Sequence, residues 1–215
     1  MMMQASAKIR APKILAILKK TYPDATCELD YQNPYELVVA VILSAQCTDK
    51  RVNMVIPALF KKYPTAQAMA KAKPDELMGL IHSTGFYRNK AKSILGFCRG
   101  IVSRHGGKVP QTMEELVALP GMGRKSANVI LGYAFGVPGI VVDTHMIRLS
   151  NRMGFTKHQD PVKIERDLMK LILKKEWTKF SSCMVWHGRR CCVARKPLCG
   201  KCPIAKLCPS AKIEA

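Results

Sequence analysis

Helix-start signals recur along this chain, and no stretch shows the alternation of apolar and polar residues that is typical of a half-buried strand. The tetrapeptide NPYE at 33–36 combines an N-cap asparagine, a proline at the first helical position and a glutamate at the third, which together favour a helix start. Thr112 and Glu115 form a capping box, and the Asp160-Pro161 step starts another helix. The sequence therefore predicts an all-α fold with short loops.

Apolar periodicity predicts where these helices lie. The apolar run Leu37–Leu43 predicts a buried helix, although a valine-rich run also suits a strand. Amphipathic helices are expected over 49–60, 74–81 and 89–102, and the helices that start at 112 and 160 are expected to end near residues 119 and 174. Thr178 is expected to cap the last helix, which ends near Gly188.

The chain is strongly basic, because 35 lysines and arginines against 15 aspartates and glutamates give a net charge of +20. Such a surface favours a polyanionic partner, and nucleic acid is the first candidate. A basic protein without a nucleic-acid partner is the alternative. Residues 77–142 contain only Glu114 and Glu115 as acids, and residues 177–213 contain none but carry eight basic residues. These two stretches can contribute to one basic face.

The segment LPGMGRKSANVIL at 119–131 places two glycines directly before a new helix. A short helix is expected to end at Leu119, and the next is expected to begin near Arg124. Gly121 and Gly123 allow positive φ and keep side chains away from the first backbone amides. Those amides and the helix dipole form an anion site that suits a DNA phosphate. An ordinary connection between two helices is the alternative.

Lys125 lies in the first turn of this helix, where the dipole disfavours a cation. The neighbouring Arg124 adds like charge, and both effects are expected to lower the pKa of Lys125. A neutral amine can attack a sugar aldehyde carbon and form a Schiff base; a solvated surface lysine is the alternative. Asp143 follows the apolar stretch 140–142 and is expected to cap the helix from Thr144, which holds its carboxylate in place.

Four C-terminal cysteines have the spacing C-x6-C-x2-C-x5-C, namely Cys192, Cys199, Cys202 and Cys208. Four thiolates in so short a segment indicate a bound metal, and the spacing leaves both zinc and an iron–sulfur cluster open. Cys191 is adjacent and is not expected to be a ligand. The remaining cysteines are expected to be buried apolar residues: Cys27, Cys47, Cys98 and Cys183.

Neither a signal peptide nor a membrane span is expected. The start MMMQASAKIRAPK has no apolar core and no cleavage site, and the longest apolar run is too short for a bilayer. A soluble protein of the cytoplasm, located at the nucleoid in a prokaryote, is therefore the expectation. Nine cysteines in such a protein are not expected to form a disulfide framework.

The chain resembles the endonuclease III family of DNA glycosylases and AP lyases over nearly its whole length. The resemblance is carried, in family order, by NPYELVVAVILSAQCTD, STGFYRNKA, LPGMGRKSAN, VDTH and the four-cysteine segment. It implies the helix-hairpin-helix glycosylase fold with two helical lobes, one over about 27–137 and one over 1–26 and 138–215. It also implies that the C-terminal loop holds a [4Fe–4S] cluster rather than zinc.

The resemblance implies roles for individual residues. Lys125 matches the family nucleophile and Asp143 the catalytic aspartate, which face each other from opposite lobes. Gln46 and Phe86 match the residues that fill the gap left by a flipped nucleotide; a local cap for Gln46 and a core aromatic for Phe86 are the alternatives. The hairpin Gly121, Gly123 and Arg124, together with His145 of VDTH, are assigned to DNA contact.

The implied reaction is removal of a damaged base, by family default an oxidised pyrimidine, followed by strand cleavage through β-elimination. The implied partner is double-stranded DNA with damaged bases or abasic sites, with no membrane, and the protein is expected to act as a monomer. Two alternatives are a glycosylase that releases only the base and a non-catalytic DNA-binding module with a structural metal. Lys125 argues against the first, and its pairing with Asp143 argues against the second.

Overall fold

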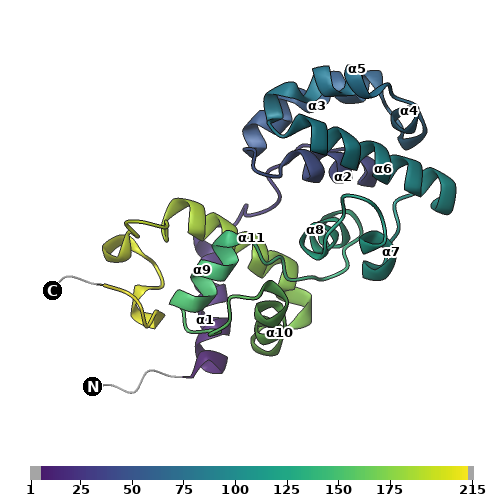
Figure 1. Ribbon diagram of the computed structural model, residues 1–215. Helices are drawn as coiled ribbons and strands as arrows, with labels where there is room; N and C mark the ends of the chain where they lie inside the picture. The colour runs from purple at the N-terminus through teal and green to yellow at the C-terminus, as the bar shows by residue number, and fades with distance from the viewer. Residues whose placement is uncertain (1–5, 213–215) are drawn as a thin grey trace. The chain divides into compact units, whose positions relative to one another are not determined.

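The computed structural model describes residues 6–212, and these residues form helices and connecting segments without strands (Figure 1). Residues 1–5, the beginning of the segment in which no signal peptide is expected, and residues 213–215 lie outside this range. The chain divides into two compact units. One is Glu28–Val137, and the other combines Met1–Cys27 with Pro138–Ala215.

The unit Glu28–Val137 consists of a series of short helices around the long helix α6. Its elements are α2 (Pro34–Leu43), α3 (Asp49–Lys62), α4 (Ala66–Ala70), α5 (Pro74–Ile81), η1 (His82–Thr84), α6 (Tyr87–His105), α7 (Met113–Val117) and α8 (Arg124–Ala134). Helix α6 packs against α4 and α5, and α2 packs against α8. This packing makes α2 and α6 the supports of the segments around residues 46, 86 and 121.

Helix α2 confirms the helical interpretation of the apolar run. Asn33 Oδ1 accepts a hydrogen bond from the backbone N–H of Glu36 at 3.0 Å, which caps the helix. The Glu36 carboxylate in turn accepts from the backbone N–H of Gln32 at 2.7 Å. Nine of the ten residues of α2 are buried, and a helix that is apolar on every side belongs inside a domain.

The second unit packs four helices around its own core. Its elements are α1 (Ala7–Thr21), α9 (Thr144–Arg152), α10 (Pro161–Leu171), η2 (Lys174–Glu176), α11 (Trp177–Arg190), η3 (Cys199–Lys201) and η4 (Ala205–Leu207). Apolar side chains of α1, α9, α10 and α11 form one core, and Ile204 of the C-terminal segment joins it. The cysteine-rich segment is therefore anchored on the helical core.

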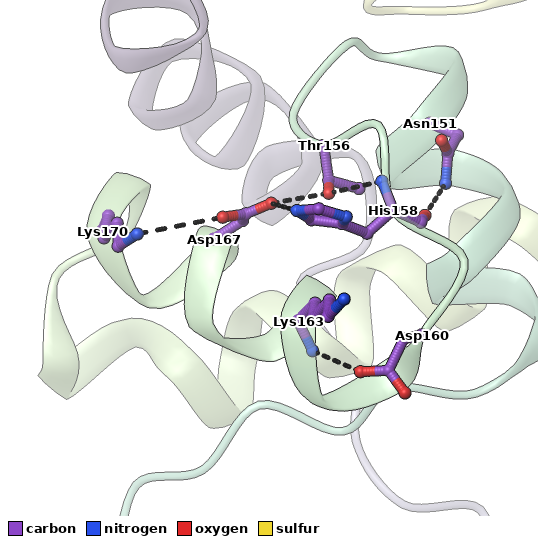
Figure 2. Close-up of polar contacts among 7 residues, drawn as sticks. All are labelled: Asn151, Thr156, His158, Asp160, Lys163, Asp167 and Lys170. Carbon is purple, nitrogen blue, oxygen red and sulfur yellow. Dashed lines mark hydrogen bonds and ion pairs between the residues drawn. The ribbon is translucent and has the colours of Figure 1, made fainter.

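Polar contacts fix the connection from α9 to α10 (Figure 2). Asp160 Oδ1 accepts from the backbone N–H of Lys163 at 2.9 Å and caps α10, which confirms the predicted helix start. Within α10, the Asp167 carboxylate accepts from Thr156 Oγ1 at 2.7 Å and lies 3.8 Å from His158 Nε2. These contacts hold the loop that precedes α10 against the helix.

The prediction for the start of the last helix was wrong. Thr178 lies inside α11, whose N-cap is Glu176, because the turn η2 leads directly into the helix. Helix α10 ends at Leu171 rather than near residue 174, since Ile172 is extended with φ −116° and ψ 137°. Within the described residues, no helix is long and apolar enough to cross a membrane.

Candidate functional site

The glycine hairpin lies between α7 and α8 and packs closely on α6. Gly121 has φ +77°, so it uses the conformational freedom that a glycine allows at this position. A Cβ atom at Gly121 would lie 2.6 Å from Ser93 Cβ and 3.2 Å from Ser93 Cα. Glycine is therefore required at position 121 for both conformation and space.

Helix α6 presents two glycines of its own to the same hairpin. A Cβ atom at Gly96 would lie 2.9 Å from Pro120 Cβ, and one at Gly100 would lie 2.8 Å from Leu119 Cδ2. Because Gly96 and Gly100 have no side chain, the hairpin can approach the backbone of α6 at these two positions. This close packing holds the beginning of α8 in a defined position.

Gly123 differs from Gly121, because it does not adopt the positive φ that a glycine allows. Gly123 is the N-cap of α8 with φ −100° and ψ 167°, an extended conformation that any residue adopts. A Cβ atom at this position would meet nothing within 4 Å, and no side chain caps the helix. The open space beside the first backbone amides of α8 is where a phosphate group can approach.

Lys125 lies in the first turn of α8 and is exposed to solvent, as is Arg124 beside it. The following residues Ala127 and Asn128 are buried and anchor the helix. The backbone N–H of Ala127 donates to the carbonyl of Gly123 at 2.9 Å, so the helix begins directly after the hairpin. Lys125 is thus accessible to solvent and lies two residues after Gly123, in the first turn of α8.

Gln46 and Phe86 share an unusual backbone conformation. Within the described residues they are the only non-glycine residues with positive φ, at 51° and 48°. Phe86 is 60% exposed, which rules out the core aromatic alternative. Gln46 is also exposed, and the nearby cap of α3 is made by Thr48, whose hydroxyl accepts from the N–H of Arg51.

Gln46, Phe86 and Gly121 line one cavity of about 210 Å³, together with Lys90 and Ser126. The segments around these residues are far apart in the sequence, and α2, α6 and the hairpin bring them together. The cavity therefore joins the two positive-φ residues to the glycine hairpin on one unit.

Asp143 in the other unit caps α9 as predicted. Its Oδ1 accepts from the backbone N–H of Met146 at 2.8 Å, and the side chain is partly buried. The preceding residues Ile140–Val142 are buried and fix the backbone that leads into the cap. The cap holds the carboxylate through Oδ1.

His145 lies in the first turn of α9 and packs against α11. A Cβ atom at Gly188 would lie 2.8 Å from His145 Nδ1, so glycine is required for this packing. Burial lowers the pKa of His145, with Asp143 opposing this effect and Arg148 adding to it. Its Nδ1 lies 3.1 Å from the guanidinium of Arg148. The imidazole is therefore held in place and favours its neutral form.

The four predicted metal ligands line one cavity of about 850 Å³ in the C-terminal segment: Cys192, Cys199, Cys202 and Cys208. All four are partly buried, and none forms a disulfide. Arg152 donates to Cys192 Sγ at 3.3 Å. Burial raises the pKa of Cys202 to about 12 and also raises the pKa of Cys208, so a bound metal centre is needed to keep these groups as thiolates. The donor set and the cavity fit an iron–sulfur cluster.

His187 is a site residue that the sequence analysis missed. It is fully buried, with Nδ1 3.1 Å from the hydroxyl of Tyr22 and Nε2 3.7 Å from Cys202 Sγ. The ligand atoms of His187, Cys191 and Cys202 all lie within 4.8 Å of one another. Tyr22 is far from His187 in the sequence, so only the packing of α1 on α11 reveals the contact.

Of the remaining cysteines, Cys98 and Cys183 are buried as predicted. Cys27 and Cys47 are only partly buried, so the expectation of full burial was wrong for these two. Both lie in connecting segments outside the helices, where solvent reaches part of the side chain.

Comparison with family models gives two matches. Residues 39–174 match the model of the HhH-GPD superfamily base excision DNA repair proteins. Residues 192–208 match the iron–sulfur binding domain of endonuclease III. The second match begins at Cys192 and ends at Cys208, so it contains the four-cysteine spacing and leaves out Cys191.

Curated relatives and solved structures agree with these matches. The chain is 61% identical to endonuclease III of Synechocystis sp. over 97% of its length and 95% of the relative's, and 46% identical to endonuclease III of Bacillus subtilis over 87% and 86%. A solved non-covalent endonuclease III–DNA complex and a trapped covalent endonuclease III–DNA intermediate each superpose with a TM-score of 0.91 at 44% identity, covering 96% of this chain and 97% or 98% of theirs.

Proposed function

We propose residue roles from the premise that this chain belongs to the endonuclease III family of the HhH-GPD superfamily. The protein is a bifunctional enzyme of base excision repair, a DNA N-glycosylase and AP lyase that carries a [4Fe–4S] cluster. In this chain the nucleophile is Lys125. The observation that supports this most strongly is its exposed position in the first turn of α8, beside the open N-cap Gly123.

Lys125 acts through its neutral amine. The nitrogen lone pair forms a bond to C1′ of the damaged nucleotide, and the glycosidic electron pair leaves with the base, which takes up a proton. Ring opening gives an iminium ion between Nζ and C1′. Loss of a C2′ proton then allows the electrons to expel the 3′ phosphate, which cleaves the strand, and water finally hydrolyses the imine.

Asp143 stabilises the positive charge that develops on the sugar as the base departs. Its carboxylate is held in place by the α9 cap, so little reorganisation is needed when the charge forms. A fixed negative charge stabilises a nearby positive charge more strongly in a site from which DNA excludes water than in bulk solvent. Asp143 belongs to the unit that contains Pro138–Ala215, and Lys125 belongs to the unit Glu28–Val137.

The hairpin binds the DNA backbone. The amides at the beginning of α8 bind a phosphate, and Arg124 adds a positive charge next to them. The target base has to leave the duplex before its C1′ can be attacked. Phe86 and Gln46 fill the gap that the flipped nucleotide leaves in the stack, Phe86 as an apolar wedge. His145 contacts DNA.

The cluster belongs to the unit that carries Asp143. Cys192, Cys199, Cys202 and Cys208 hold it, and Arg152 donates a hydrogen bond to one of the ligating sulfurs. When bound, the cluster provides an iron centre that crosslinks the C-terminal loop. Seven of the eight basic residues of 177–213 lie at the end of α11 or in the C-terminal segment and contribute to the attraction of DNA.

The substrate is double-stranded DNA with an oxidised pyrimidine or an abasic site, and the protein acts on it as a monomer, at the nucleoid of a prokaryotic cell. A panel of duplexes with one damaged base each tests the lesion class. Oxidised pyrimidines are expected to be released and the strand cleaved at the same position. Release of free base from every duplex without strand cleavage would show a monofunctional glycosylase instead.

Asp143→Asn separates catalysis from folding at this position. Asparagine is as good an N-cap as aspartate, so the melting temperature is expected to stay unchanged. Base release is expected to slow by roughly two orders of magnitude or more, because the developing charge loses its counter-charge. Wild-type base release by this variant would remove Asp143 from the proposed mechanism.

A further inference from the structure

Lys90 in α6 is almost fully buried, with only 4% of its surface exposed, which is rare for a lysine. Burial lowers the pKa of Lys90, and the nearby Cys47 opposes this effect. Lys92, two residues further along the same helix, is exposed. An apolar side chain at position 90 would avoid the cost of burying an ammonium group. The polar contacts of this ammonium group are therefore of interest.

The ammonium group of Lys90 donates to the backbone carbonyl of Thr84 at 2.7 Å. A hydrogen bond from a charged donor is stronger than a bond between neutral groups. Thr84 is itself buried, and its hydroxyl donates to the carbonyl of Ile81 at 2.8 Å. Two hydrogen bonds therefore hold Thr84, one from Lys90 to its carbonyl and one from its hydroxyl to Ile81.

Thr84 lies directly before a turn with two consecutive positive φ values. Gly85 has φ +68° and ψ 161°, and Phe86 has φ +48° and ψ 26°. Such conformations persist only where the surroundings hold them. Lys90 holds this turn at both ends, because its backbone N–H also donates to the carbonyl of Phe86 at 3.0 Å.

Lys90 also lines the cavity that contains Gln46 and Phe86. We infer that Lys90 is a positioning residue, whose ammonium group fixes the 84–86 turn so that Phe86 is presented to the DNA stack. This inference rests on the wedge role proposed for Phe86. Lys90 acts through the turn and contacts neither the sugar nor the base.

Hydrogen exchange of the turn tests the inference without depending on catalysis. Lys90→Met keeps the length of the side chain but removes the ammonium group, and Lys92→Met makes the same change at an exposed site of the same helix. Amide exchange over 82–89 is expected to become about tenfold faster or more in Lys90→Met and to stay at the wild-type rate in Lys92→Met. Unchanged exchange in Lys90→Met, or faster exchange across all of Glu28–Val137, would overturn the inference.

A double-mutant cycle with Phe86→Ala tests whether Lys90 acts through Phe86. Lys90→Met alone is expected to slow base release from an oxidised-pyrimidine duplex about tenfold, and to have no further effect when Phe86 is already alanine. An equal loss in both backgrounds would contradict the inference. If Phe86→Ala leaves base release unchanged, the wedge proposal fails, whereas the exchange measurement still decides whether Lys90 holds the turn.

Discussion

Alanine is expected to have different effects at the two hairpin glycines, although only Met122 separates them: it should lower stability at Gly121 and weaken DNA binding at Gly123. At Gly121, alanine must adopt φ +77°, which costs about 1–2 kcal/mol for a residue with a Cβ atom. The added atom would also lie 2.6 Å from Ser93 Cβ and 3.2 Å from the backbone at Ser93 Cα. Relief of such overpacking costs about 1–3 kcal/mol, so Gly121→Ala should destabilise its unit by about 3 kcal/mol.

At Gly123, alanine meets neither problem, because φ is −100° and nothing lies within 4 Å of the added atom. The free energy of unfolding of Gly123→Ala should stay within about 1 kcal/mol of wild type. The methyl group would nevertheless occupy the space through which a phosphate approaches α8. Binding to duplex DNA is therefore expected to weaken by about tenfold, or about 1.4 kcal/mol.

Urea denaturation followed by far-UV circular dichroism measures the stability of these variants. Tryptophan fluorescence is less suitable, because Trp177 and Trp186 both lie in α11 of the other unit. The midpoint of Gly121→Ala should fall by roughly 1–2 M urea. Gly79→Ala in α5 is the control, since a Cβ atom there also meets nothing within 4 Å. Equal stability losses at Gly121 and Gly123, or wild-type DNA binding by Gly123→Ala, would refute the reasoning.

Three further predictions concern the wedge, the cluster and the basic surface. Phe86→Ala should slow base release from damaged duplex but affect cleavage of an abasic site less, because little stacking is broken there; equal losses on both substrates, measured in single-turnover assays, would indicate a folding defect. The purified protein should contain about four irons per chain; Cys199→Ser should lose them and Cys191→Ser should keep them, and zinc in place of iron would overturn the cluster assignment. Affinity for undamaged duplex should fall steeply with salt, with a log–log slope of several units, and a flat response would separate the +20 charge from DNA binding.

Local signals in the sequence predicted several elements of the fold correctly. The helix over 74–81 was predicted with the bounds that α5 has, because Pro74 marks its first position. The caps at Asn33, Thr112 and Asp143 were also predicted, since each depends on a hydrogen bond to a residue three positions along the chain. Interactions of this kind are encoded within a few residues.

Other features depend on packing between distant segments and leave no local signal. Helix α1 was not predicted, because Ser6 makes no side-chain cap and Pro12 lies inside the helix. The burial of Lys90 depends on how α6 packs against other helices. It could not be predicted, because a lysine in an amphipathic helix is expected at the surface. The contact of His187 with Cys202 likewise depends on how the C-terminal segment lies against α11.

Borohydride trapping tests the central claim, that Lys125 attacks C1′, most directly. Reduction of the imine during turnover should join the wild-type enzyme covalently to a damaged or abasic duplex, and peptide mapping should place the DNA on Lys125. Lys125→Gln keeps the hairpin and the α8 amides and should bind duplex without trapping, and Lys125→Arg should behave alike because arginine stays protonated. Trapping of Lys125→Gln at the wild-type rate would show that another amine is the nucleophile and would contradict this account.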